Sequence, residues 1–197
     1  ALPILSMKSL LLATTLAAFF AGPASAAVLF SNDFDGNVSV GSGIGVTMLD
    51  NGALETANTI GDWTGSYFVN RSAGNPAAMS TLTLTNLLPH TQVSATFIVG
   101  FLESWDSFDG GCCAPDNLDF FIDGNKVATL TARNALGTIE EFGGGTVTGQ
   151  FVQANGNTYH FDTIVDMSTA GFLTFAHTGS TLTLAIQASG NGWQGGD

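Results

Sequence analysis

Positive charge is nearly absent from this sequence, which holds only four Lys and Arg residues against sixteen Asp and Glu residues. The net charge of −12 makes nucleic acid and anionic membrane surfaces poor partners, whereas divalent cations are good ones. For most of these acids the simpler interpretation is that they keep a surface rich in Gly and Thr soluble.

Catalytic signatures are missing too, since no nucleophile elbow, phosphate loop, HExxH or CxxC motif occurs. The histidines, His90, His160 and His177, lie far apart in a turn and two strand patterns, so we expect ordinary structural roles for them. No strand carries carboxylates in the pattern that glycoside hydrolysis on a β-sandwich requires. We therefore expect no enzyme. The alternative is a polysaccharide-active hydrolase or lyase, for which Glu103 and Glu141 are the best candidates.

No apolar run at the N-terminus is long enough to span a bilayer, because spanning takes roughly 20 residues and the run Leu10 to Ala21 has about 12. This run follows the basic Met7-Lys8 and precedes Ala24-Ser25-Ala26, the small-x-small pattern of signal peptidase sites. We expect residues 7–26 to be a helical signal peptide cleaved after Ala26. Residues 1–6 would be upstream translated sequence without a structural role, and residues 27–197 one domain.

Helical periodicity is nearly absent after that segment, and alternation of apolar residues with Thr or Ser takes its place. This alternation is typical of half-buried strands. Turn signals such as Asp123-Gly124-Asn125, which suits a tight hairpin, separate the strands. The pattern predicts an all-β, antiparallel sandwich of jelly-roll type with about ten strands. We expect strands at 28–34, 46–49, 66–70, 81–85, 93–99, 118–122, 126–131, 149–153, 158–166, 172–177 and 181–186.

The segment from Glu103 to Asn125 combines five aspartates with glycines between two apolar runs, which indicates an acidic loop on a β scaffold. A hard cation takes six to eight oxygens from such carboxylates and loop carbonyls. The sequence thus predicts a structural calcium site, or else plain loop solvation. The metal candidates are Asp106, Asp109 and Asp116, with Asp33 and Asp35 from a neighbouring strand.

Cys112 and Cys113 are the only cysteines, and an exported location favours their oxidation. Neighbouring Cα atoms lie about 3.8 Å apart, below the usual disulfide range, so a bridge between them would be a strained vicinal disulfide. We favour this disulfide. Free thiols and a bridge to another chain are the alternatives.

Three tryptophans, Trp63, Trp105 and Trp193, lie close to predicted loops. Aromatic faces stack on sugar rings, so Trp63 and Trp193 are candidate ligand-binding residues. For Trp105, which follows an apolar strand, we expect instead that the ring closes one end of the core.

Several short motifs resemble one family of secreted bacterial proteins: PheSerAsnAspPheAsp at 30–35, LeuProHisThr at 88–91, SerTrpAsp at 104–106, and CysCysAlaProAsp followed by PhePheIleAspGly. The chain is similar to jelly-roll proteins that commonly end in a PEP-CTERM sorting tail read by an exosortase. In similar proteins glycine directly follows SerTrpAsp, whereas Ser107-Phe108 intervene here.

The resemblance implies a protein of the cell surface or biofilm matrix of a Gram-negative bacterium. It implies no agreed enzymatic activity, and a sandwich similar to concanavalin-like and MAM-type binding modules. We accordingly expect a non-enzymatic module that binds extracellular polysaccharide or acts as a structural component. Similar proteins continue into a further strand and the sorting tail, so this chain is interpreted as a fragment whose open sheet edge favours self-association.

Overall fold

The computed structural model describes residues 4–15, 26–60, 63–70, 72–102, 105, 115–132, 141–152 and 161–190. These residues form fourteen strands and two short 3-10 turns, η1 (Met167–Thr169) and η2 (Gly171–Leu173). All strand pairs are antiparallel, which confirms the predicted all-β sandwich. In the described ranges no helix is long and apolar enough to span a membrane.

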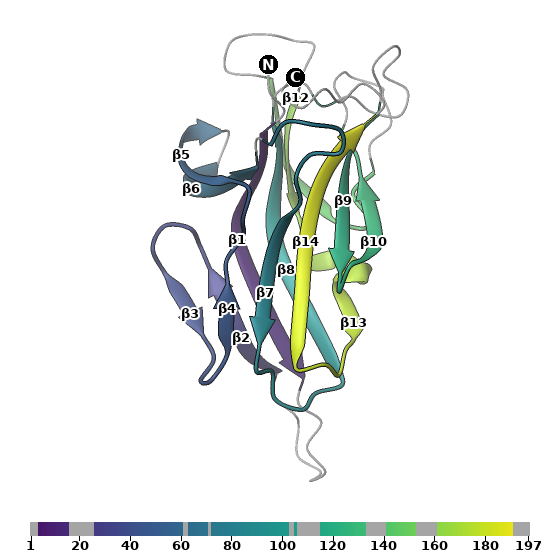
Figure 1. The fold of residues 1–197 in the computed structure, drawn as a ribbon. Helices are drawn as coiled ribbons and strands as arrows, with labels where there is room; N and C mark the ends of the chain where they lie inside the picture. Colours follow the sequence, from purple (N-terminus) through teal and green to yellow (C-terminus); the bar gives the residue numbers. More distant parts are fainter. Residues whose placement is uncertain are drawn as a thin grey trace.

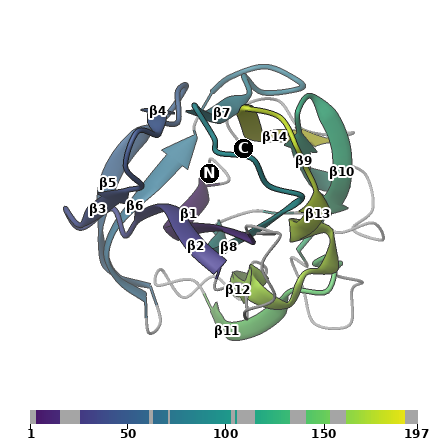
Figure 2. The ribbon, with the colours of Figure 1, turned by 90° about the horizontal axis from the view of Figure 1, so that it is seen from below.

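The strands form two sheets that face each other (Figure 1). Viewed along the strands, both layers curve around a common interior (Figure 2). Sheet A contains β1 (Ile4–Thr15), β2 (Ala26–Asn32), β3 (Val38–Val40), β5 (Ala53–Ile60), β6 (Trp63–Asn70), β8 (Gln92–Leu102), β11 (Thr146–Val152), β12 (Phe161–Asp166) and β13 (Thr174–Ala176). Sheet B has the order β10 (Asn125–Leu130), β9 (Asp116–Ile122), β14 (Thr181–Gly190), β7 (Ser80–Thr85) and β4 (Gly45–Thr47).

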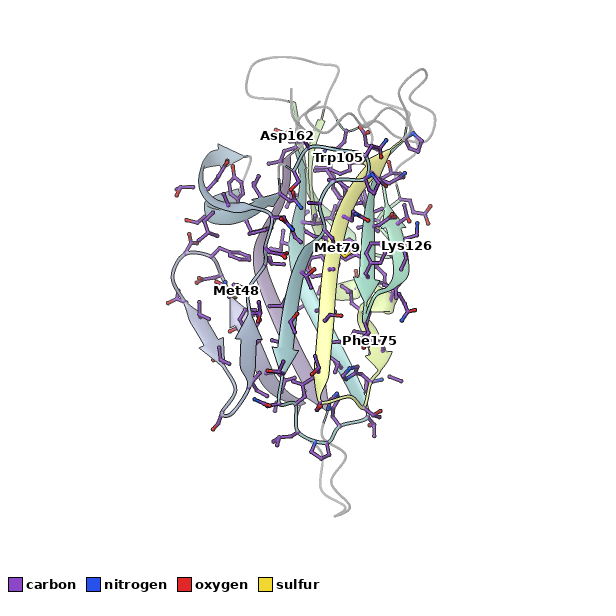
Figure 3. The ribbon with its side chains drawn as sticks, viewed as in Figure 1. Met48, Met79, Trp105, Lys126, Asp162 and Phe175 are labelled. Carbon is purple, nitrogen blue, oxygen red and sulfur yellow. The ribbon has the colours of Figure 1, made fainter. Side chains whose placement is uncertain are left out.

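The core lies between the sheets and follows the predicted alternation. In β7 the buried Leu82 and Leu84 alternate with half-buried threonines, because successive side chains of a strand point to opposite faces. Across the interior the rings of Phe97 in β8 and Phe120 in β9 stack with centroids 5.2 Å apart. Trp105 is fully buried and meets Phe101 edge-on at the upper end of the sandwich (Figure 3), which confirms its expected role in the core.

The turn between β9 and β10 is the tight hairpin that the sequence predicts. Asp123 and Gly124 have φ angles of 49° and 77°, the positive values that a primed two-residue turn requires. The Asp123 carboxylate also accepts a hydrogen bond from the backbone N–H of Thr183 at 2.9 Å, so this turn is attached to β14.

The N-terminal segment differs from the expectation. Residues Ile4–Thr15 do not form the helix of a signal peptide but strand β1. Ile4 to Ser6, which the sequence places in the segment upstream of the signal peptide, lie within this strand. The physical reason is that neighbouring strands lie along both edges of β1 and can pair with its backbone.

Candidate functional site

Asp33, one of the predicted calcium ligands, lies in the loop after β2 and is engaged by that loop itself. Its carboxylate accepts hydrogen bonds from the backbone N–H groups of Asp35 and Asn37, both at 2.9 Å, and from the Asn37 side chain at 2.5 Å. These bonds, above all the one from the Asn37 side chain, lower the pKa of the Asp33 carboxyl below its usual range. Asp33 therefore shapes the turn between β2 and β3.

Asp35 reaches across to β6. Its carboxylate accepts a hydrogen bond from the backbone N–H of Ser66 at 2.5 Å and lies against the Cα of Gly65. Gly65 has a φ of +92°, and a Cβ at this position would collide with the Asp35 carboxylate, so glycine is required for this approach. Asp35 thus attaches the β2–β3 turn to β6.

Asp116 is on the other sheet, at the start of β9, and is only 5 % exposed. Asp33 and Asp35 lie instead in the turn between β2 and β3, two strands of sheet A. Asp106 and Asp109 lie outside the described residues. Within the described ranges no three His, Cys, Asp or Glu side chains are arranged to hold a metal ion.

Cys112, Cys113 and Trp193 also lie outside the described residues, so the vicinal disulfide stays a prediction. Trp63 begins β6, where it pairs with Ile60 of β5. Of the alternative catalytic carboxylates, Glu103 is outside the described residues. Glu141 is exposed and its backbone pairs with that of Thr131 in an isolated bridge.

Two histidines that the sequence does not link are in direct contact in the structure. His90 Nε2 lies 2.6 Å from His177 Nδ1, and the two rings are within 20° of coplanar, with centroids 4.9 Å apart. The pair lies near Phe175, at the end of the sandwich opposite Trp105 (Figure 3). The contact is closed to solvent, since His90 and the His177 side chain are each 7 % exposed.

The partners of the outer nitrogens determine where the protons of this pair are. His90 Nδ1 lies 2.6 Å from the carbonyl oxygen of Leu88, and His177 Nε2 lies 3.1 Å from that of Thr181 and 3.3 Å from the Asp123 carboxylate. These oxygens only accept, so both outer nitrogens must donate. The contact between the two rings ties the turn before β8 to the start of β14.

Two hollows, each of about 250 Å³, lie side by side along sheet A. The first is lined by Asn32, Phe34, Met48, Leu49, Gly52, Ala53, Leu54 and Phe68, and the second by Asn51, Gly52, Ala53, Val69 and Ser72. They share Gly52 and Ala53, so the start of β5 forms a ridge between them. We call the two hollows together the β5 groove.

The ridge and floor of the β5 groove are held firmly. A Cβ on Gly52 would collide with the Phe68 ring and the Val69 carbonyl, so the backbone lies directly on β6 there. The Asn51 side chain donates to the Met79 carbonyl at 2.8 Å. Phe34 has a φ of 61°, rare for a bulky residue, and its N–H donates to Asn32 Oδ1 at 2.8 Å. Such a strained conformation at a groove floor is a feature of functional sites.

The rim of the β5 groove is apolar and exposed, with Leu54 62 % and Met48 39 % accessible. Figure 3 shows Met48 at the side of the molecule, beside β3 and β4. A separate cavity in the core, bordered by Phe97, Phe120 and Leu82, is entirely apolar and measures about 30 Å³, too small for a ligand.

Comparison of the chain with protein-family models, with curated proteins and with solved structures gives no significant match. The likeness to PEP-CTERM proteins therefore stays a resemblance of short motifs.

Proposed function

We propose that the chain is an exported, non-enzymatic β-sandwich module of the bacterial cell surface or matrix, and that it binds a neutral polysaccharide in the β5 groove. The observation that carries this proposal is the lining of the groove. None of the side chains that line the two hollows is charged, although the chain as a whole has a net charge of −12.

A neutral sugar chain matches this lining on two counts. Its C–H faces suit the exposed Leu54 and Met48, and its hydroxyl groups suit the amide of Asn51 and the hydroxyl of Ser72 in the second hollow. Ligand sites combine mostly apolar walls with a few fixed polar groups in this way. Two neighbouring hollows fit successive sugar units of a polymer. The backbone at Gly52 is already fixed, so less conformational entropy is lost when the ligand binds.

Affinity electrophoresis of the full chain in gels that contain neutral or acidic polysaccharides tests the proposal. Retardation is expected in a neutral polysaccharide. Ala53→Arg places a long side chain on the ridge between the two hollows, and Leu54→Glu adds a charge at the rim. Each should weaken binding of the neutral polysaccharide about tenfold or more. The matched control is Leu88→Glu, at a residue that is 66 % exposed in a turn away from the groove. The proposal would be contradicted if all three variants were retarded equally. It would also be contradicted if the parent chain were not retarded at all.

The alternative function, a polysaccharide-active enzyme, is distinguished from a binding module by the products that an enzyme would release. Release of reducing sugar that disappears in Glu103→Gln or Glu141→Gln would replace the binding module with a hydrolase. Export is tested by sequencing secreted material from its N-terminus, which should begin at Ala27.

A structural calcium ion remains part of the proposal, with Asp106, Asp109 and Asp116 as ligands and without Asp33 and Asp35. Calcium at about 100 times its dissociation constant would stabilise the fold by roughly 2.7 kcal/mol. The melting temperature would then rise by about 5 to 11 °C. Identical melting curves in EDTA and in millimolar calcium would exclude the ion.

A further inference from the structure

Strand β1 joins three parts of sheet A, since it pairs with β8, β6 and β2. Along one edge it pairs with β8, from Ile4 opposite Leu102 to Thr15 opposite Gln92. Along the other edge its first half pairs with β6 and its second half with β2. Among the described strands, the hairpins β2–β3 and β5–β6 have no other pairing with the rest of the sheet.

The same residues carry the features of a cleavable leader, and the inference therefore rests on the export proposed above. Cleavage after Ala26 would remove β1 and divide sheet A into β8 with β11, β12 and β13, the hairpin β2–β3, and the hairpin β5–β6. The facing edges of β8 and of β2 with β6 would then hold backbone N–H and C=O groups without a strand partner. Unpaired edges of this kind recruit another strand.

The register of β1 against β8 defines what fits between these edges. Four apolar positions of β1 lie opposite buried core residues of β8: Leu5 opposite Phe101, Met7 opposite Val99, Leu10 opposite Phe97, and Leu12 opposite Ala95. The intervening positions Ser6, Leu11 and Ala13 lie opposite Gly100, Thr96 and Ser94. The site thus takes an extended segment with apolar residues at alternate positions and one irregularity, between Met7 and Leu10.

We propose that the processed protein has a strand-acceptor site between β8 and the pair β2 and β6, and that it binds an extended, alternately apolar segment of another polypeptide there. Main-chain hydrogen bonds to both edges supply affinity, and the core positions beside Phe97 and Phe101 supply specificity. Direct closure of the gap is disfavoured because both hairpins would have to shift by about 4.8 Å towards β8. Asp35 and its bond to β6 tie the two hairpins together, so they would have to move as one.

The test uses the full chain, folded before it is cut. A protease site inserted between β1 and β2, within residues 16–25, allows β1 to be cut from the folded chain. The part from β2 onward then does not have to fold without β1. The cut chain should retain the β1 fragment during gel filtration and exchange it for a labelled synthetic peptide of residues 4–15. At about 100 times its dissociation constant the peptide should raise the melting temperature of the stripped chain by about 5 to 11 °C.

Two peptide variants separate specific insertion from adhesion. Leu10→Asp with Leu12→Asp changes the positions opposite Phe97 and Ala95, and it should weaken binding at least about 100-fold because a buried unpaired charge is costly. The control, Leu11→Asp with Ala13→Asp, changes the positions opposite Thr96 and Ser94 and should stay within about tenfold.

Equal binding of both variants, or a stripped chain that melts as before and takes up no peptide, would overturn the proposal. A stable dimer that excludes the peptide would overturn it as well and would assign the site to a second copy. These outcomes are distinct from a failure of export. Secreted protein that still carries residues 4–15 would refute the processing step, whereas peptide exchange by the cut chain would still show that the site exists.

Discussion

The contact between His90 and His177 makes a quantitative prediction about stability. Replacing His177 with Phe keeps a ring of similar shape but leaves His90 Nε2 buried without its 2.6 Å partner. An unsatisfied buried polar group costs about 1 to 3 kcal/mol, so His177→Phe should lower the melting temperature by about 2 to 12 °C. His90→Phe should cost about as much, because it orphans His177 Nδ1.

The double variant His90→Phe/His177→Phe should be more stable than the sum of the single losses predicts. It removes both inner nitrogens at once, and replacing both partners with apolar groups of the same shape costs little. The carbonyl oxygens that lose their donors belong to Leu88 and Thr181, both exposed residues that water can reach. We expect the double variant to lose at least about 1 kcal/mol less than the sum of the two single losses.

Urea unfolding of the parent, the two single variants and the double variant near pH 6.5 measures this coupling. If the single losses add to within about 0.5 kcal/mol, the contact between the two rings does not stabilise the fold.

Three smaller predictions concern other polar and close-packed positions. Asn37→Ala should raise the pKa of Asp33 towards its usual range in an NMR titration, because the largest cause of the lowering is gone. In the parent, the lowered pKa of Asp33 means that its hydrogen bonds stabilise the turn when the pH is above the usual pKa range of a carboxyl group. This stabilisation is lost as the pH falls through the pKa of Asp33 in the folded state. Gly52→Ala should destabilise by more than about 1 kcal/mol in urea unfolding, whereas Gly171→Ala, which meets no atom within 4 Å, should stay within about 0.5 kcal/mol. Asp123→Asn should cost at most about 1 kcal/mol, because its side chain is 41 % exposed and its contact with His177 Nε2 is 3.3 Å long.

The strands that bury one face could be predicted from the sequence because apolar and polar residues alternate along them. Thr81 to Thr85 and Thr181 to Ile186 became β7 and β14, which pair with each other in the sheet. The exposed strands lack this alternation. Val38–Val40 is exposed at all three positions, and β5 begins with the exposed Ala53 and Leu54, so neither β3 nor β5 was predicted.

The candidate sites could be predicted only where the partners are close in the sequence. Asp33 and Asn37 form a local turn, whereas His90 and His177 are separated by 87 residues and meet only because β13 pairs with the beginning of β8. The β5 groove likewise depends on Gly52 lying against β6, which no spacing in the chain indicates. The hydrogen bonds that Asp33 and Asp35 accept from backbone N–H groups are seen only in the structure, because the acidic pattern does not indicate them.

The conflict over the N-terminal segment has a physical origin, because a short apolar run specifies burial and does not specify secondary structure. In a membrane the run Leu10 to Ala21 must satisfy its backbone groups internally and so becomes helical. In the folded chain the edges of β8, β2 and β6 offer those hydrogen bonds from outside, and the twelve residues Ile4–Thr15 become a strand. The proposed cleavage site lies within this pairing, with Ala26 opposite Thr15 and Ala27 opposite Thr14. A leader whose backbone is paired with three strands is not available as the helix that a membrane requires. The proposed export and the completion of sheet A would therefore compete for the same segment.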